Sequence, residues 1–249
     1  MTPDIIKVAI NKYCQEKHIE GLSLKTVMFD MDGVLFDSMP YHAQSWHRAM
    51  ADFGLNLPVE EAFMHEGRTG AGTIGIVTRR QFNREATEEE CKAIYQRKSQ
   101  YFNEISETKR MPFAYETVKA VKECGIVPIV VTGSGQASLL GKLERNFPGL
   151  FKSEWMVCAK DVKLGKPNPE PYLMGMKKSG IAHEWETMVV ENAPLGIEAG
   201  HKSGCFVVAV NTGPLPDEML MKAGANLLFH SMKELSEWIN YISNLSLKL

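Results

Sequence analysis

Residues 25–38 read KTVMFDMDGVLFDS. The short apolar and β-branched run at 26–29 predicts a buried β-strand, and Asp30 and Asp32 follow it directly. Residues i and i+2 of an extended chain point to the same side, so both carboxylates are expected to face one space. In an open parallel sheet this strand end borders the ligand site, although the same acids could simply be solvated in a turn.

The composition of the chain sets limits on its class. It has 249 residues, of which 44% are hydrophobic and 23% charged, as in ordinary soluble globular proteins. This length suits one large domain or a core with a second unit inserted. The net charge of −2 offers no excess of basic residues for binding nucleic acid. The apolar runs are only as long as strands, so no membrane partner is expected.

The N-terminal segment and the cysteines bear on location. Residues 1–17 are amphipathic and charged throughout, unlike a secretory signal, and residues 1–22 are expected to form a helical extension outside the core. The five cysteines are scattered without a CxxC motif. This pattern predicts reduced thiols and a cytoplasmic protein, not disulfides or zinc.

Runs of strand length alternate with helix-length segments along much of the chain. The expected strands are residues 26–29, 127–131, 155–157, 187–190, 206–210 and 226–229. The expected helices of this part are residues 113–123, 136–145, 170–178, 195–202 and 232–242. The alternation predicts an α/β fold, a Rossmann-like, doubly wound parallel sheet with helices on both faces.

One long interval carries helical patterns only. The helices expected there are residues 45–53, 59–65, 73–84 and 87–106, the last starting with a capping box of Thr87 and Glu90. We therefore expect a helical cap domain at 39–111, inserted into an α/β core formed by 23–38 and 112–249. The two crossings, at 37–40 and 110–113, each carry a proline and form a natural hinge pair.

Polar residues also follow other expected strands. Thr132, Gly133 and Ser134 follow one strand, where small residues let backbone N–H groups approach an anion and hydroxyls add donors. Lys166 lies in a loop that three prolines make rigid. It is therefore a better candidate than Lys163 for a cation held in a fixed position.

Glu191 and Asn192 follow the strand at 187–190 and add a further polar cluster to the same sheet edge. With Asp30 and Asp32 they offer carboxylate and amide oxygens, which suit Mg²⁺ because this ion keeps waters and takes its remaining oxygens from a phosphate. Hydroxyls, N–H groups and Lys166 suit the phosphate itself. The edge therefore predicts magnesium-assisted phosphate chemistry.

These clusters resemble the four motifs of the haloacid dehalogenase (HAD) superfamily of phosphotransferases, specifically its β-phosphoglucomutase-like branch. The matching segments are FDMDG, VVTGSG, GKPNPEPYL and VVENAPLGIEAG. The resemblance implies that Asp30 is a nucleophile forming an aspartyl-phosphate and that Asp32 is the general acid/base. It also implies that Thr132 and Lys166 bind the transferring phosphoryl oxygens.

The resemblance extends to the inserted cap. It implies that His42 is a hinge histidine, that Lys98 faces the leaving group, and that Arg68 reads the non-transferring part of the substrate. Arg68 and Lys98 are expected to be able to hold a second phosphate together. With Gly133 and Ser134 they complete the expected substrate-binding set.

The fourth motif departs from the family pattern, which usually has two acids. Here Asn192 removes one charge, and two unit charges ~4 Å apart attract by roughly 4 kcal/mol at an effective dielectric constant of ~20. Either the enzyme is weakened, or Glu66 swings in from the cap loop as a metal ligand and replaces the lost charge. The expected Mg²⁺ ligands are Asp30, Asp32, Asn192, Glu66 and Glu191.

The segments EGRTG and ENAPLG together resemble a small bacterial subgroup that includes an inorganic pyrophosphatase. This resemblance implies a monomeric hydrolase of pyrophosphate or another small phosphate compound. A hexose-phosphate mutase of the β-phosphoglucomutase type and a general sugar-phosphate phosphatase remain alternatives, as does a non-catalytic binding protein that keeps the fold.

Overall fold

The computed structural model describes residues 1–104, 108–134 and 139–246. Its sheet has the strand order β2-β1-β3-β4-β5, and every neighbouring pair is parallel. The strands are β1 (Thr26–Phe29), β2 (Val127–Val130), β3 (Thr187–Glu191), β4 (Phe206–Val210) and β5 (Leu227–Phe229). The predicted α/β, Rossmann-like parallel sheet is confirmed.

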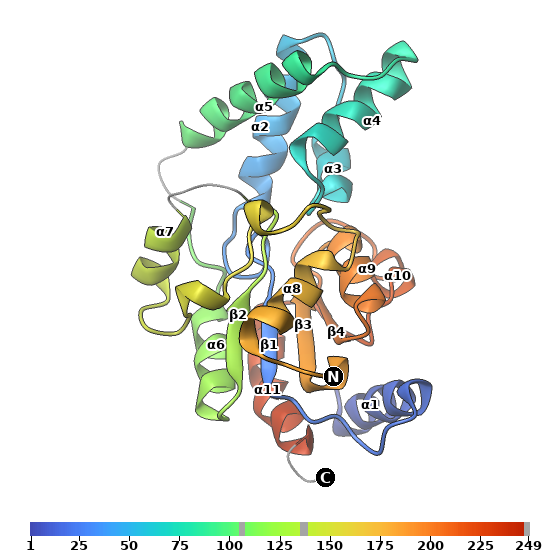
Figure 1. Ribbon diagram of the computed structural model, residues 1–249, viewed down its shortest axis with the longest axis vertical. Helices are drawn as coiled ribbons and strands as arrows, with labels where there is room; N and C mark the ends of the chain where they lie inside the picture. Colours follow the sequence, from blue (N-terminus) through green and yellow to red (C-terminus); the bar gives the residue numbers. More distant parts are fainter. Residues whose placement is uncertain (105–107, 135–138, 247–249) are drawn as a thin grey trace.

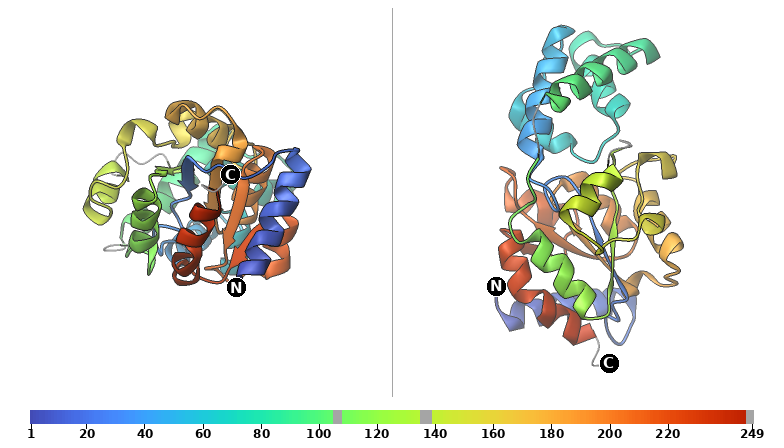
Figure 2. Two further views of the ribbon diagram at one scale, coloured as in Figure 1. Left: turned by 90° about the horizontal axis from the view of Figure 1, so that it is seen from below. Right: turned by 90° about the vertical axis from the view of Figure 1, so that its left-hand side faces the viewer.

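Helices cover both faces of this sheet (Figures 1 and 2). Val27 and Phe29 of β1 pack into one hydrophobic cluster, and Met28 between them packs into the other. The first cluster includes residues of α1 (Pro3–Lys17), α6 (Ala114–Glu123), α7 (Leu139–Asn146) and α11 (Met232–Ser246). The second includes residues of α8 (Glu170–Ser179), α9 (Pro194–Lys202) and α10 (Asp217–Lys222), the last of which was not predicted.

Four helices of the inserted segment lie above the sheet in Figure 1. They are α2 (Met39–Asp52), α3 (Val59–Ala62), α4 (Gly70–Phe82) and α5 (Glu88–Asn103). They bury a small core of their own, which includes Met50, Ile74 and Ile94. The predicted capping box of Thr87 and Glu90 starts α5. The limits of the cap domain at residues 39 and 111 stay a prediction.

Two local predictions are wrong. Residues 155–157 form no strand, because the backbone turns through a short 3-10 helix at Ser153–Trp155 and only Val157 bridges to Val131. The first cap helix begins at Met39 instead of residue 45, because Pro40 fits the first turn of a helix. Part of the expected crossing at 37–40 is therefore helical.

The remaining short elements are 3-10 helices at Phe63–His65, Ala159–Asp161 and Glu184–Glu186. In the part of the chain that the structure describes, no helix is both long and apolar enough to cross a membrane. All five cysteines are free thiols.

Candidate active site

The carboxyl end of β1 carries the two aspartates. The backbone N–H of Asp30 donates to the Val190 carbonyl at 3.0 Å, and the N–H of Asp32 donates to Asp30 Oδ2 at 3.0 Å. The chain then turns at Gly33, where φ is +80° and an added Cβ would lie 2.0 Å from Asn192 Nδ2. Only glycine fits this turn, which seats the loop after β1 directly against Asn192.

Lys166 lies between two buried carboxylates. Its Nζ donates to Asp30 Oδ1, to Glu191 Oε1 at 2.6 Å and to the Val131 carbonyl at 3.2 Å. Burial lowers the pKa of Lys166, but Asp30 and Glu191 outweigh burial and hold that pKa above its ordinary value. Burial raises the pKa of Asp30, and Lys166 offsets only part of this rise. One ammonium thus faces two carboxylates, which leaves negative charge for a further cation to neutralise.

Glu191 is hydrogen-bonded within the protein at both carboxylate oxygens. Oε1 accepts from Lys166 and from the Tyr172 hydroxyl, the latter at 2.8 Å. Oε2 accepts from the backbone N–H groups of Asn192 at 2.9 Å and Ala193 at 3.2 Å. These contacts favour a role in holding Lys166 over the predicted role of Glu191 as a metal ligand.

Asn192 joins the core to the cap loop. Its Nδ2 donates to both carboxylate oxygens of Glu66 at 3.1 Å, and its Oδ1 is buried without a hydrogen-bond partner. A buried oxygen without a partner is costly, so this atom indicates a group that it would bind. Burial, Asp30 and Glu191 raise the pKa of Glu66 well above its ordinary value, and a dication would relieve this repulsion.

The predicted Mg²⁺ site fits these donors in part. Asp30, Glu66 and Asn192 supply two carboxylates and an amide oxygen at one end of the sheet, whereas the Asp32 carbonyl stays a predicted ligand. Within the described ranges, no three His, Cys, Asp or Glu side chains form a metal cluster. Mg²⁺ tolerates so few protein ligands because it keeps several waters and binds substrate phosphate.

Asp32 ends a hydrogen-bonded chain that starts in the cap. Its Oδ1 accepts from Ser38 Oγ and lies 3.2 Å from His42 Nε2, while His42 Nδ1 lies 2.7 Å from Lys98 Nζ. Because an ammonium can only donate, Nδ1 accepts and Nε2 carries the proton of a neutral imidazole. Burial lowers the pKa of His42, in agreement with this state, and its ring stacks on Phe102 with centroids 4.1 Å apart.

The buried ammonium of Lys98 makes the stability of the fold depend on pH. Burial lowers its pKa to about 8 from the ordinary 10.5, so the unfolded chain binds this proton more tightly than the folded one. The free energy of unfolding should therefore rise from about pH 8 to about pH 10.5, by at most about 1.4 kcal/mol per pH unit from this group. Lys98→Met should remove that rise. Urea denaturation of both proteins across this window measures it, and equal slopes would contradict the assignment.

The loop after β2 supplies the predicted hydroxyls. The backbone N–H of Ser134 donates to Thr132 Oγ1 at 3.0 Å. A Cβ added at Gly133 would lie 3.4 Å from the Gly67 carbonyl, so the cap loop rests directly on this core loop. The predicted helix start at residue 136 lies outside the described residues.

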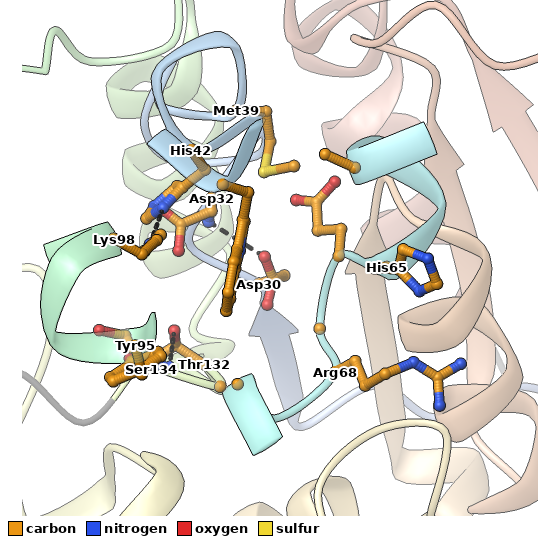
Figure 3. A pocket seen from close by; sticks show the side chains of 16 residues that line it. Asp30, Asp32, Met39, His42, His65, Arg68, Tyr95, Lys98, Thr132 and Ser134 are labelled. Carbon is orange, nitrogen blue, oxygen red and sulfur yellow. Dashed lines mark hydrogen bonds and ion pairs between the residues drawn. The ribbon is translucent and has the colours of Figure 1, made fainter. Parts of the chain in front are cut away.

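A cavity of about 100 Å³ lies between the sheet edge and the cap (Figure 3). It is lined by both aspartates, by the loop after β2 and by cap residues that include Glu66 and Lys98. Pockets for small organic ligands usually measure about 300–1,000 Å³. The volume therefore favours a compact ligand.

The sequence profile of haloacid dehalogenase-like hydrolases matches residues 27–210. The chain belongs to this family. This hydrolase is 30% identical to hexitol phosphatase A of Escherichia coli, over 85% of its own chain and 93% of that protein. It is 53% identical to a solved structure from Bacteroides vulgatus, provisionally assigned as a β-phosphoglucomutase, with a TM-score of 0.95 and 100% of both chains covered. Pyrophosphatase PpaX of Oceanobacillus iheyensis is 25% identical over 76% of this chain and 84% of that protein.

Arg68 of this hydrolase lines the cavity, but its guanidinium points away from Asp30 in Figure 3. Its Nε is buried without a hydrogen-bond partner. Lys98 lies on the opposite side of the cavity in the same view. The arrangement does not bring together the two cations that were expected to hold a second phosphate.

Sequence reasoning missed several residues of the hydrolase site. Ser38 and Tyr172 bond Asp32 and Glu191, and both lie in or beside matched motifs, where a nearby hydroxyl was the available signal. Trp46 and Tyr95 line the cavity from the cap helices. Nothing in their local sequence distinguishes them from residues of the cap core.

Proposed function

We propose that this hydrolase is a Mg²⁺-dependent phosphohydrolase that acts through an aspartyl-phosphate, with inorganic pyrophosphate as its preferred substrate. The contact of Glu66 with Asn192 carries the proposal, because it brings a cap carboxylate to the core edge above a cavity of only about 100 Å³. A compact, highly charged substrate suits such a space better than a hexose phosphate does. The similarity to a pyrophosphatase supports this choice.

In the proposed first step, an Asp30 oxygen attacks one phosphorus and the bridging P–O bond breaks, so that free phosphate leaves. Lys166 and Thr132 bind the transferring oxygens and neutralise their charge. The proposed residues that would hold Mg²⁺ are Asp30, Asp32, Asn192 and Glu66. When bound, the ion supplies positive charge that reduces repulsion between the carboxylate and the phosphate.

In the proposed second step, Asp32 takes a proton from water as the water oxygen attacks the aspartyl-phosphate and Asp30 is released. Burial raises the pKa of Asp32, but His42 and Ser38 outweigh it and hold that pKa below its ordinary range, so the carboxylate is ionised and able to accept a proton. Phosphate is a much weaker base than a sugar alkoxide and needs less help from an acid in leaving. This difference also favours pyrophosphate over a phosphate ester.

The second candidate function is hydrolysis of a hexitol or sugar phosphate. Trp46 and Tyr95 give the cavity an aromatic wall, with ring centroids 6.0 Å apart, and such walls commonly line sites for organic ligands. The similarity to hexitol phosphatase A supports this candidate. A mutase reaction would in addition require the aspartyl-phosphate to be protected from water.

Phosphate release by the purified protein with Mg²⁺ separates these functions. We expect kcat/KM for pyrophosphate to exceed that for hexitol and hexose phosphates by at least roughly 10²-fold. The reverse order would favour the second candidate. Isomerisation of β-glucose 1-phosphate without turnover of pyrophosphate would contradict hydrolysis as the main activity.

Glu66→Gln is expected to raise the Mg²⁺ concentration for half-maximal activity by at least roughly tenfold, because the cap then lacks its charged ligand. Magnesium titration of pyrophosphate hydrolysis measures this shift. Glu60→Gln is the matched control, since Glu60 is an exposed carboxylate of the same cap segment. A titration curve that Glu66→Gln leaves unchanged would remove Glu66 from the metal site.

The proposal extends to location and assembly. The five free cysteines favour a reducing compartment, and we place the protein in the cytoplasm as a monomer that acts on a small phosphate compound.

A further inference from the structure

Tyr172 of α8 contacts the end of β3 that carries Glu191. It lies near the start of α8, is 0% exposed, and donates its hydroxyl proton to Glu191 Oε1 at 2.8 Å. Its ring also faces the ammonium of Lys166, with 5.1 Å between Nζ and the ring centroid. Tyr172 therefore contacts both members of the Lys166–Glu191 pair.

The carboxylate of Glu191 receives four donors, two at each oxygen. A carboxylate offers about four lone-pair positions, so these donors occupy its whole accepting capacity. The two backbone donors belong to residues 192 and 193, directly before α9, and they hold Oε2 in place. The two side-chain donors, Lys166 and Tyr172, hold Oε1.

Of the two donors to Oε1, the hydroxyl of Tyr172 is the one that serves Glu191 alone. Lys166 also bonds Asp30 and the Val131 carbonyl, so it is shared among three acceptors. Without the hydroxyl, Oε1 would regain an accepting position and could turn toward a cation beside Asp30. With it, binding a cation would require Glu191 to give up a buried hydrogen bond, which costs free energy.

We propose that Tyr172 is a positioning residue that keeps Glu191 paired with Lys166 and out of the metal site, so that the site depends on Glu66 of the cap. This inference rests on the proposed function, because it concerns the Mg²⁺ site of that reaction. It explains why the metal site would need the carboxylate of Glu66, although the core already carries Glu191 in the fourth motif.

Mn²⁺ alone, detected by electron paramagnetic resonance, is the probe for a double-mutant cycle of Glu66→Gln and Tyr172→Phe. Glu66→Gln in the native background should weaken Mn²⁺ binding at least roughly tenfold. In the Tyr172→Phe background, Glu191 is free to substitute, so the loss from Glu66→Gln should be smaller by roughly threefold or more. A merely structural tyrosine would instead leave the two effects independent.

Tyr13→Phe is the matched control for this cycle. Tyr13 is also buried and donates its hydroxyl proton at 2.8 Å, to the Gly204 carbonyl, but it belongs to α1 and bonds no residue of the site. The Tyr13→Phe substitution should leave the loss of Mn²⁺ affinity caused by Glu66→Gln unchanged. The same recovery with Tyr13→Phe would overturn the proposal, because the effect would then not depend on Glu191.

Two other outcomes would overturn the inference. One is an equal loss from Glu66→Gln in both tyrosine backgrounds. The other is a loss of Mn²⁺ affinity from Glu191→Gln alone as large as that from Glu66→Gln, which also decides the question if Tyr172→Phe fails to fold. Absence of Mn²⁺ binding by the unmodified protein would overturn the magnesium part of the proposed function as well, so the two failures are distinguishable.

Discussion

Asp30→Asn is expected to lower kcat for pyrophosphate by roughly 10⁴-fold or more, while the protein still folds. The amide keeps the shape of the carboxylate but cannot form the aspartyl-phosphate, and loss of a nucleophile in covalent enzymes has effects of this order. Asparagine has the same size as aspartate, and Lys166 keeps Glu191 as its counter-ion, so we expect the fold to be kept. Phosphate release and circular dichroism on the same preparation measure both parts.

Asp37→Asn is the matched control for Asp30→Asn. Asp37 is an exposed aspartate in the same loop after β1, and we expect nearly native activity from its variant. Rapid quenching with labelled pyrophosphate should trap acid-stable label on the native protein and none on Asp30→Asn. Appreciable residual turnover by Asp30→Asn, at above about a tenth of the native rate, would exclude Asp30 as the nucleophile.

Lys166→Met is expected to affect stability and activity together. The variant leaves Asp30 and Glu191 buried without their counter-ion, and breaking a buried pair in this way costs about 3–5 kcal/mol of unfolding free energy. It also removes a cation from the transferring phosphoryl group, so kcat should fall by roughly 10³-fold. Urea denaturation and a pyrophosphate assay measure the two losses.

The pH dependence of the stability of Lys166→Met gives an independent test of this cause. Burial already raises the pKa of Asp30 and Lys166 offsets part of that rise, so without Lys166 this carboxylate holds its proton more tightly in the folded chain than in the unfolded one. Stability should therefore fall as pH rises, and the deficit relative to the native protein should shrink in acid. Lys163→Met, an exposed lysine of the same loop, is the control and should change little. A deficit that does not vary with pH would contradict the proposed cause.

The sheet was predictable because its strands are short, continuous apolar runs. In a parallel sheet covered on both faces, each strand is buried on both sides, so the signal is local in the sequence. For this reason the strands at Thr26–Phe29 and Phe206–Val210 were predicted with the same bounds that the structure shows. Residues 155–157 carry a similar but shorter run, and there the turn at Ser153 decides the structure.

The candidate site at the sheet edge was predictable as a set of residues and not as a set of contacts. Asp30, Lys166 and Glu191 were expected at one sheet edge, and the structure brings these three into hydrogen bonds. The part played by each follows from donors elsewhere in the chain, such as Tyr172, which occupies the accepting position that a metal would need. The direction of the Arg68 side chain likewise depends on packing of the cap loop and not on local sequence.

The Glu66–Asn192 contact has a consequence for the affinity of the enzyme for its cation. Under the proposed function, one carboxylate belongs to the cap and the others to the core, so thermodynamic reciprocity applies to closure and cation affinity. Whatever factor the cation adds to the closed population, closure adds to the affinity for the cation. Cation binding and cap closure are then cooperative: a rise in magnesium concentration shifts the enzyme toward the closed state, and every contact that favours closure tightens cation binding.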